Sequence, residues 1–424
     1  MSQAGNRRSR PRATLLIVGS EMTDPRRGDA NGPFAREALG NLGVEVAAVH
    51  RVGDDVADLR EAFRCARLTS DIVLASGGLG PTGDDLTRDG LAELLGRSVV
   101  EDPAWAAALE ERLRARGKGM SDLARRQALI VQGSEALPNE MGLACGGWVE
   151  EGGRVFALLP GVPREFRDIL DNQVLPRLQR RFTERPETLV VRATVAGLPE
   201  VEAEPVLAPW YGRDGLEVSI LPSLGVLKIS FRLTRPPCGD LEGTVSEIRS
   251  CLEEGFRHHL VSLEGDSLSE ALGRGLLDRS WTLAVGESCT GGLLSRKVVS
   301  VSGASRYFLG SVTAYANEAK MNVLGVPRGI IERFGAVSEE TALAMVRGVR
   351  ARFNASCGVA TTGVAGPAGG TPEKPVGTVW IAAGTPEGER AMKVFFPLDR
   401  ASVMELSSNY ALYTLWRMVH QEKG

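Results

Sequence analysis

The chain repeats one arrangement: a short apolar run, a turn that often carries glycine, and then a segment with helical spacing of its apolar residues. Apolar runs at 15–19, 44–49 and 71–75 alternate with helical patterns at 34–42 and 56–67. Such alternation predicts a parallel sheet with helices on both faces, hence an α/β fold class. Ligand sites in sheets of this kind lie beyond the carboxyl ends of the strands. We therefore look for function in the turns that follow strands.

At 424 residues the chain exceeds what one hydrophobic core supports, so two or three domains are expected. Polar stretches at 181–186 and 261–266 resemble linkers. The predicted parts are a disordered tail at 1–12, a doubly wound α/β domain at 13–180, a small α+β middle module at 187–258 and a C-terminal α/β domain at 262–424.

Composition limits the classes of partner. The formal net charge is −3, without the basic excess that direct nucleic-acid binding needs. The longest apolar runs are too short to span a bilayer, and no signal-type segment follows the polar N-terminus. The six cysteines are scattered without a Cys-x-x-Cys pair, so neither a disulfide framework nor a zinc site is indicated. We expect a cytoplasmic protein that acts on a small molecule.

The turn Gly286–Gly292 carries the strongest chemical signal. It follows an apolar strand at 281–285 and leads into a helical pattern at 293–299. A nucleophile in such a turn lies beside free backbone amides that can stabilise an oxyanion. Ser288 is the leading candidate, and Cys289 and Thr290 remain alternatives. A plain strand-to-helix turn is the competing interpretation.

A base for this nucleophile is not supplied by histidine. The four histidines (50, 258, 259 and 420) lie outside the glycine-rich loops of the last domain, whereas a lysine base is a known alternative. Lys320 is predicted in the first turn of a helix, where the dipole opposes its charge and eases deprotonation. Tyr315, just before it, is a candidate to orient Lys320 or relay a proton. A solvated lysine and a packing tyrosine are the alternative.

A third glycine-rich loop, Thr361–Gly370, follows the predicted strand at 357–360. Its successive amides and hydroxyls suit an anion such as phosphate. It matches neither a Walker loop nor a dinucleotide fingerprint, and a flexible connection is the simplest alternative.

Together these segments resemble the CinA C-terminal family over about residues 265–420. The matching motifs, in order, are Gly286–Gly292, Gly303–Ser305, Ala314–Lys320, Gly335–Glu340, Thr362–Gly366 and Lys374–Thr378. The resemblance implies a homodimer that hydrolyses the carboxamide of nicotinamide mononucleotide to a carboxylate and ammonia, without a cofactor for that step. It implies Ser288 as nucleophile with Lys320 and Tyr315 as its activating partners. The implied substrate-binding residues are Cys289, Thr290, Gly291, Gly292, Ser305, Asn317, Thr362, Gly363, Ala365 and Gly366.

The N-terminal half resembles the molybdopterin-binding-like domain of full-length CinA proteins, through the loop Gly77–Thr87. In the family this half is linked to metal-dependent ADP-ribose pyrophosphatase activity. Asp84 and Asp85 are candidates to hold a divalent cation through oxygen ligands, with helix capping as the alternative. The implied ligand-site residues are Glu21, Asn31, Gly77, Gly78, Gly80, Thr82, Asp84, Asp85, Pro160 and Gly161.

Several positions in this half depart from the family pattern, among them Gly83, Ala124 and the run Leu143–Gly146. Loss of polar groups from a phosphate-handling site removes ligands and orientation. We therefore expect pyrophosphatase activity to be weak or absent. The leading interpretation is a nicotinamide-nucleotide amidase; the alternatives are an ADP-ribose pyrophosphatase and a non-catalytic partner in competence or DNA repair.

Overall fold

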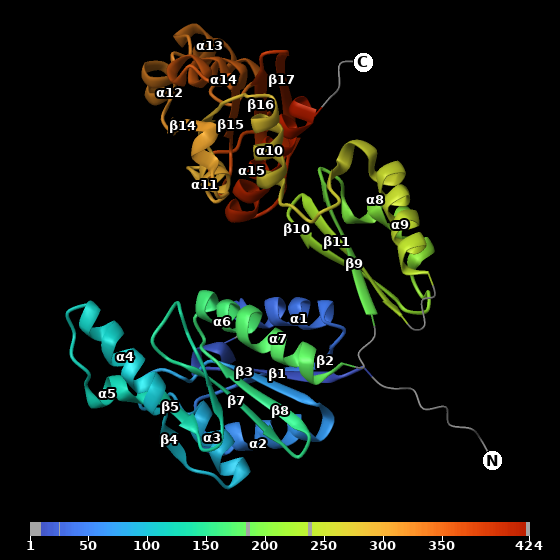
Figure 1. Ribbon diagram of the computed structural model, residues 1–424. Helices are drawn as coiled ribbons and strands as arrows, with labels where there is room; N and C mark the ends of the chain where they lie inside the picture. Colours follow the sequence, from blue (N-terminus) through green and yellow to red (C-terminus); the bar gives the residue numbers. More distant parts are fainter. Residues whose placement is uncertain (1–9, 25, 184–186, 236–239, 421–424) are drawn as a thin grey trace. The chain divides into compact units, whose positions relative to one another are not determined.

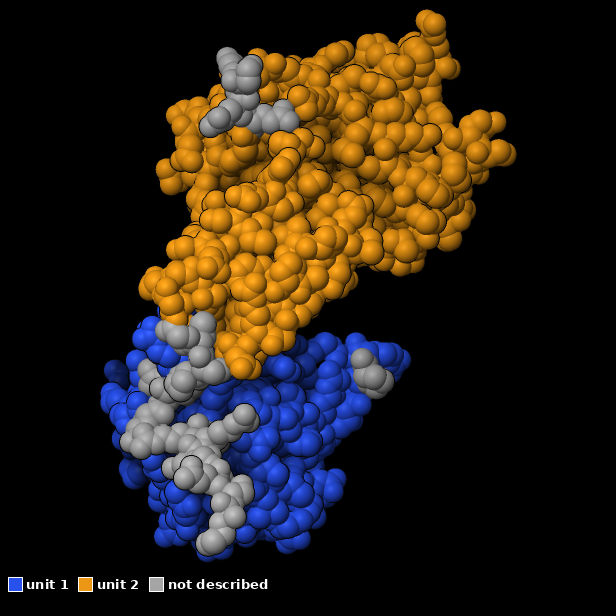
Figure 2. Space-filling model, turned by 90° about the vertical axis from the view of Figure 1, so that its right-hand side faces the viewer, with its two compact units in different colours: residues 1–189, 234–236 blue, residues 190–233, 237–424 orange. Residues whose placement is uncertain are grey.

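The computed structural model describes residues 10–24, 26–183, 187–235 and 240–420 (Figure 1). Residues 1–189 and 234–236 form one compact unit, and residues 190–233 and 237–424 form a second (Figure 2). Most of the tail predicted at 1–12 lies outside the described residues. Its last residue, however, already belongs to strand β1, where the Arg12 amide donates to the Asp71 carboxylate at 2.8 Å.

The first unit is built on a six-stranded sheet in the order β2-β1-β3-β8-β7-β6. The strands β2, β1, β3 and β8 run parallel to one another, which confirms the prediction for this part of the sheet. β7 and β6 are antiparallel additions that the sequence pattern did not reveal. The bounds are β1 Arg12–Val18, β2 Glu45–Val52, β3 Ile72–Ser76, β6 Glu135–Leu137, β7 Gly146–Glu151 and β8 Arg154–Leu159.

Helices cover both faces of this sheet, as the βα alternation predicts. Leu15 packs with Leu39 on one face, and its neighbour Leu16 packs with Phe63 on the other, because successive strand residues point to opposite sides. The first face carries α1 (Asn31–Asn41), α6 (Pro163–Ile169) and α7 (Leu175–Arg181); the second carries α2 (Val56–Thr69) and α3 (Thr87–Leu95). The remaining elements are β4 (Val99–Glu101), α4 (Pro103–Ala115), α5 (Asp122–Arg125) and β5 (Leu129–Val131).

The glycine turn after β3 packs too closely for any side chain. Gly77 has φ +109°, and a Cβ there would lie 2.2 Å from the Val18 carbonyl oxygen. Gly78 has φ +64°, and its Cβ would lie 2.2 Å from the Thr87 hydroxyl. Both positions therefore require glycine on conformational and steric grounds.

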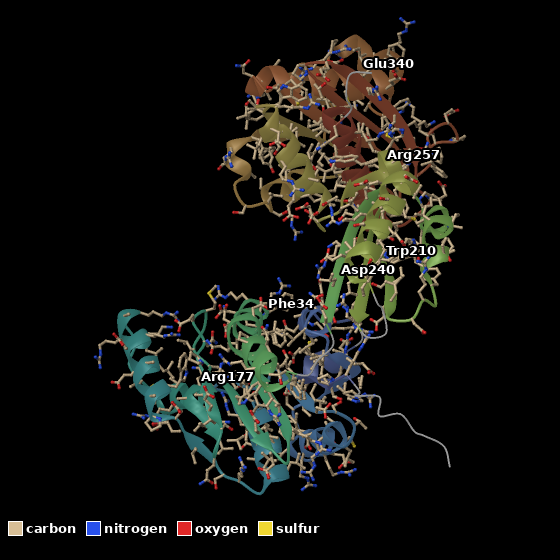
Figure 3. All side chains as sticks on the ribbon, turned by 45° about the vertical axis from the view of Figure 1, so that its right-hand side comes forward. Phe34, Arg177, Trp210, Asp240, Arg257 and Glu340 are labelled. Atoms are coloured by element: carbon tan, nitrogen blue, oxygen red, sulfur yellow. The ribbon has the colours of Figure 1, made fainter. Side chains whose placement is uncertain are left out.

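The middle module combines a four-stranded sheet, in the order β10-β11-β9-β12, with two helices. Its elements are β9 (Glu187–Ala196), α8 (Glu200–Leu207), β10 (Leu216–Ser223), β11 (Val226–Arg235), α9 (Leu241–Phe256) and β12 (Leu260–Ser262). Trp210 lies just after α8 (Figure 3). Its ring meets that of Phe231 of β11 edge-on, with ring centroids 5.9 Å apart. The linker predicted at 261–266 is wrong in its first residues, because Leu260–Ser262 forms a short strand against β9.

The C-terminal part contains a five-stranded sheet in the order β14-β13-β15-β16-β17. Strand β13 lies between β14 and β15 and runs parallel to both, and the strands from β15 to β17 pair antiparallel. Its elements are α10 (Leu268–Asp278), β13 (Leu283–Glu287), α11 (Leu293–Val299), β14 (Phe308–Thr313), α12 (Asn317–Leu324), α13 (Arg328–Phe334), α14 (Glu339–Phe353), β15 (Cys357–Gly363), β16 (Thr378–Thr385), β17 (Gly388–Phe395) and α15 (Arg400–His420).

The long helix α15 connects this sheet to the middle module. It packs on one face of the sheet together with α10, whereas α14 covers the other face. Its Asn409 amide donates to the Leu224 carbonyl at 2.8 Å, and its Tyr413 hydroxyl donates to the His258 carbonyl at 3.2 Å. These contacts account for the middle module and the C-terminal part forming one compact unit. Over the described stretches, no helix combines the length and apolar character that crossing a membrane requires.

Candidate active site

The carboxyl end of β13 fixes the turn that bears Ser288. The Glu287 carbonyl accepts a hydrogen bond from the Ala314 amide at 2.7 Å, just beyond β14. The Ser288 amide donates to the Thr361 carbonyl of β15 at 3.0 Å. Both neighbouring strands therefore hold the backbone on either side of Ser288, and the serine lies at the carboxyl edge of the sheet, as predicted for a ligand site.

Lys320 reaches Ser288 from helix α12. Its ammonium nitrogen lies 3.0 Å from Ser288 Oγ and donates to the carbonyl oxygens of Ala314 and Tyr315, each at 3.1 Å. Lys320 is 2% exposed and Ser288 7% exposed. The structure thus brings together the two residues that sequence reasoning paired as nucleophile and base.

The surroundings of Lys320 favour its neutral form. Burial lowers the pKa of Lys320 below its ordinary value of 10.5, while electrostatic interactions with Cys289 and Glu318 act in the opposite direction. Burial disfavours a charged amine because water no longer solvates it. Lysine becomes a general base only when it loses its proton, so this shift is in the direction that catalysis needs.

The two competing nucleophiles have different surroundings. Burial raises the pKa of the Cys289 thiol to about 12, so its reactive thiolate is scarce at neutral pH. The Thr290 hydroxyl is fully buried and donates to a Glu287 oxygen at 2.7 Å. Of the three candidates, Ser288 is the one whose side chain contacts the lysine amine.

The amides at the start of α11 differ from what we expected. The sequence predicted that they are free, but the Glu287 carboxylate accepts hydrogen bonds from the amides of Gly292, Leu294 and Ser295 at 2.9, 3.1 and 2.9 Å. A side chain one residue before the nucleophile therefore occupies the helix N-terminus. The pattern of apolar residues contains no information on this contact.

A pocket of about 190 Å³ opens onto the Ser288–Lys320 pair. Sequence reasoning missed Arg400 in its wall, because Arg400 begins a helix far along the chain. The Arg400 guanidinium donates to the Tyr315 hydroxyl at 2.9 Å and to the Gly366 carbonyl at 2.7 Å. The lining residues are Ser288, Cys289, Tyr315, Asn317, Lys320, Ala336, Val337, Thr362, Gly363, Ala365 and Arg400.

We expected Tyr315 to orient Lys320 or to relay a proton, but the structure shows a different contact between them. Its backbone carbonyl, not its hydroxyl, meets Lys320, and its side chain is 61% exposed beside Arg400. Thr362 is held in the wall by donating to the Ala336 carbonyl at 2.7 Å. The predicted residues that do not line this pocket are Thr290, Gly291, Gly292, Ser305 and Gly366; of these, Ser305 is exposed on the segment that follows α11.

Two family models match this chain: the CinA C-terminal domain over residues 265–419 and the probable molybdopterin binding domain over residues 14–180. A CinA-like protein of Acidobacterium capsulatum is 37% identical over 406 residues, which cover 94% of this chain and 98% of the relative. A CinA-like protein of Koribacter versatilis is 36% identical over 405 residues, again covering 94% and 98%. The chain belongs to the CinA family.

Among solved structures, a CinA superfamily protein from Escherichia coli is 32% identical to this chain, with a TM-score of 0.35. The match covers 36% of this chain and 88% of that protein. The family predicted from the motifs is confirmed for both α/β halves. The names of these relatives state no substrate.

The molybdopterin-binding-like half of this CinA-family chain has its own pocket, of about 680 Å³, at the carboxyl edge of its sheet. It contains most of the predicted ligand-site residues, namely Glu21, Gly77, Gly78, Gly80, Asp84, Asp85, Pro160 and Gly161. Asn31 and Thr82 are not in its lining. The buried Asn31 amide instead donates to the Ser76 hydroxyl at 2.9 Å and the Gly161 carbonyl at 2.8 Å.

The two aspartates of this pocket do not form a ready cation site. Asp85 accepts hydrogen bonds from the Thr82 amide at 2.8 Å and the Thr82 hydroxyl at 2.6 Å. Throughout the described ranges, no group of three or more histidine, cysteine or acidic side chains is arranged to hold a metal ion. The described side chains alone therefore do not enclose a divalent cation, and a cation held jointly by the two carboxylates, water and a substrate phosphate stays a prediction.

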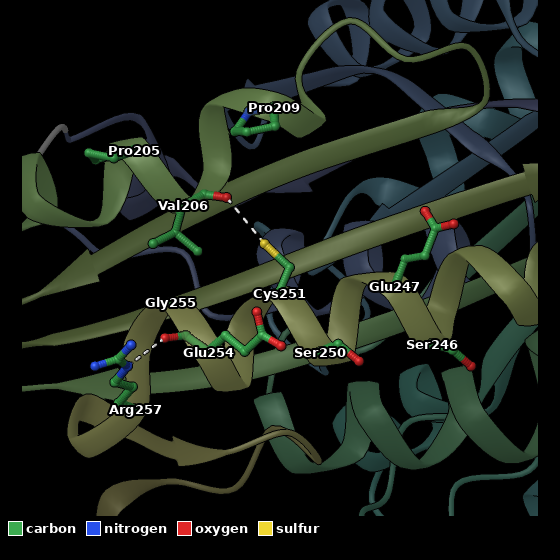
Figure 4. A pocket seen from close by; sticks show the side chains of 10 residues that line it. All are labelled: Pro205, Val206, Pro209, Ser246, Glu247, Ser250, Cys251, Glu254, Gly255 and Arg257. Atoms are coloured by element: carbon green, nitrogen blue, oxygen red, sulfur yellow. Dashed lines mark hydrogen bonds between the residues drawn. The ribbon is translucent and has the colours of Figure 1, made fainter.

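A wider groove, of about 760 Å³, lies on the middle module between α8 and α9 (Figure 4). The Cys251 thiol donates to the Val206 carbonyl at 3.7 Å, and Arg257 Nε donates to the Glu254 carbonyl at 3.1 Å. Its lining of prolines, serines and glutamates brings no nucleophile next to a base. Size alone therefore does not identify the reactive site of this chain.

Proposed function

We propose that the C-terminal domain hydrolyses the carboxamide of nicotinamide mononucleotide, giving nicotinate mononucleotide and ammonia. The observation that carries this proposal is the buried contact of 3.0 Å between Lys320 Nζ and Ser288 Oγ. Membership of the CinA family supports the choice of substrate, and the serine–lysine pair supports the choice of an amide bond.

The neutral amine of Lys320 has two N–H groups and one lone pair, and three partners surround it. The carbonyls of Ala314 and Tyr315 accept the two N–H groups, which directs the lone pair toward the hydroxyl of Ser288. As Ser288 Oγ attacks the carboxamide carbon, its proton passes to Lys320. The new C–O bond converts the carbonyl oxygen to an oxyanion on a tetrahedral carbon.

Collapse of this intermediate breaks the C–N bond, and the ammonium of Lys320 donates its proton to the departing nitrogen. Ammonia leaves, and the nicotinoyl group remains as an ester on Ser288. Neutral Lys320 then takes a proton from water, whose oxygen attacks the ester carbon. As the ester C–O bond breaks, the ammonium of Lys320 returns its proton to Ser288 Oγ, and the carboxylic acid that leaves gives its proton to solvent. Ser288 is then again a hydroxyl and Lys320 a neutral amine.

The size of the pocket indicates how the substrate binds. About 190 Å³ is below the roughly 300–1,000 Å³ of pockets that enclose a drug-sized ligand. We therefore place the pyridine ring and its amide inside, with the ribose phosphate at the mouth. Arg400 lines this pocket and is exposed to solvent, so its guanidinium is the candidate partner of the phosphate.

Ammonia release from nicotinamide mononucleotide by the full chain tests the proposal. Ser288→Ala removes the nucleophile and should abolish release without changing the fold. Gly286→Ala is a matched control on the same strand, since its added Cβ would lie at an ordinary 3.5 Å from the nearest atom. Undiminished release by Ser288→Ala, or none by the wild type, would reject the assignment.

The expected homodimer and the cytoplasmic location stay predictions, and light scattering on the purified chain tests the first. Direct nucleic-acid binding, which the net charge of −3 disfavours, is tested by a gel shift at several salt concentrations.

A further inference from the structure

Glu287, the last residue of β13, is fully buried and directly precedes the nucleophile. Its two carboxylate oxygens accept five hydrogen bonds. Three come from the amides of Gly292, Leu294 and Ser295, and two from the hydroxyls of Thr290 and Ser295. All five donors belong to the turn after Ser288 or to the first turn of α11, and all five are neutral.

This arrangement determines which amides are left for chemistry. The first amides of α11 are bonded to Glu287 or, for Leu293, to the Thr290 carbonyl at 3.1 Å. Within the part of the chain that the structure describes, the amides of Cys289 and Thr290 donate to no acceptor of another residue, and the Cys289 amide interacts with its own thiol sulfur. An amide directly after a nucleophile is well placed to stabilise the oxyanion that the nucleophile creates.

We propose that Glu287 is a positioning residue that sets the turn 288–292. By accepting hydrogen bonds from the first amides of α11, it directs the amide of Cys289, which lines the pocket, toward the oxyanion and keeps Ser288 Oγ against Lys320. The oxyanion part of this inference rests on the proposed amidase function. The part that concerns the orientation of Ser288 does not rest on that function, because this orientation affects the reaction of the serine with any electrophile.

A carboxylate is needed here because every partner is a donor. In Glu287→Gln, one oxygen becomes an NH₂ group that faces amide and hydroxyl donors and cannot accept from them. In Glu287→Asp, the side chain is one methylene shorter and cannot reach both the turn and Ser295. Each change should move the turn by a fraction of an ångström.

Labelling of Ser288 by a sulfonyl fluoride, followed by intact mass, measures the reactivity of the serine without the natural substrate. For Glu287→Gln we expect labelling and kcat for ammonia release to fall by about 10- to 100-fold, because small misplacements cost that much. We expect KM within about twofold and an unchanged acid limb of the pH profile, since the carbonyl partners of Lys320 remain. If Glu287 had a structural role alone, Glu287→Gln would lower the fraction of folded protein and leave the labelling rate and kcat of each folded molecule unchanged.

Two further variants make the test decisive. Ser295→Ala removes a hydroxyl donor on the helix side, and we expect a smaller loss of labelling rate of about three- to tenfold. Glu332→Gln, an exposed carboxylate paired with Arg328 on α13, is the matched control and should label as wild type.

Glu287→Gln labelled within about threefold of wild type would overturn the inference. If Glu287→Gln fails to fold, labelling of Ser295→Ala at the wild-type rate would overturn the inference instead. Wild-type protein that is labelled at Ser288 but releases no ammonia rejects the amidase function and leaves the labelling comparison valid. Wild-type protein that resists labelling rejects both.

Discussion

Lys320→Met removes the proposed base with little change in side-chain volume. Because general acid–base catalysis contributes about 10²- to 10⁴-fold, kcat for ammonia release should fall by that factor. At about 1.4 kcal/mol per decade, the barrier rises by roughly 3–5 kcal/mol. Methionine suits this site better than alanine, because a 2% exposed side chain that is truncated leaves a cavity.

The same variant tests the protonation state of the lysine through stability. Burial lowers the folded-state pKa of Lys320 below 10.5, so between the two pKa values the unfolded chain binds more protons than the folded chain. The stability of the wild type should therefore rise with pH in that window, by up to about 1.4 kcal/mol per pH unit. Lys320→Met lacks this group, and its stability should lack that slope.

Urea unfolding followed by tryptophan fluorescence, repeated from neutral to alkaline pH, measures the difference in slope, and coupled ammonia detection measures kcat. Two carbonyls lose their donor in the variant, which costs about 1–3 kcal/mol each if water does not replace it. That loss is independent of pH and does not affect the slope. Retention of more than about a tenth of wild-type kcat would refute the role of Lys320 as base.

Four further outcomes are expected. Glu318→Gln removes a charge that raises the pKa of Lys320, so the rising limb of the activity profile should move to lower pH. Cys289→Ala should keep kcat within about threefold, and wild-type activity should resist iodoacetamide, because burial raises the pKa of this thiol to about 12. Arg400→Ala should raise KM by about ten- to hundredfold with little effect on kcat, as expected for loss of a charged hydrogen bond. Asp85→Asn should leave ammonia release unchanged, and wild-type protein should release AMP from ADP-ribose far more slowly than it releases ammonia.

The sequence predicted those elements whose structure depends on residues close together in the chain. Helical spacing predicted α11 at 293–299 with the bounds that the structure has. Sequence reasoning paired Ser288 with Lys320 by residue type and by family resemblance, and the structure shows that they follow two adjacent strands.

Contacts between distant segments were not predictable in the same way. Arg400 meets Tyr315 across 85 positions, and neither residue stands in a pattern that pairs them. The antiparallel strand β7 was missed because its sequence, two glycines, Trp148, Val149 and two glutamates, shows no alternation of apolar and polar residues. The sequence places Glu287 in the turn after the strand predicted at 281–285, and no pattern indicates that its carboxylate accepts five hydrogen bonds from the turn and from α11.

The carbonyls beside Lys320 explain how one geometry can serve both halves of the reaction. They favour the ammonium form, whereas burial favours the neutral amine, so the two effects oppose each other in setting the pKa. When the amine has taken a proton, its three N–H groups find the two carbonyls and the oxygen on Ser288 already in place. Proton transfer in either direction therefore requires no movement of the lysine, and such preorganisation lowers the cost of reaching the transition state. A histidine would need a separate partner to hold its ring, whereas here the backbone just before α12 holds the amine by itself.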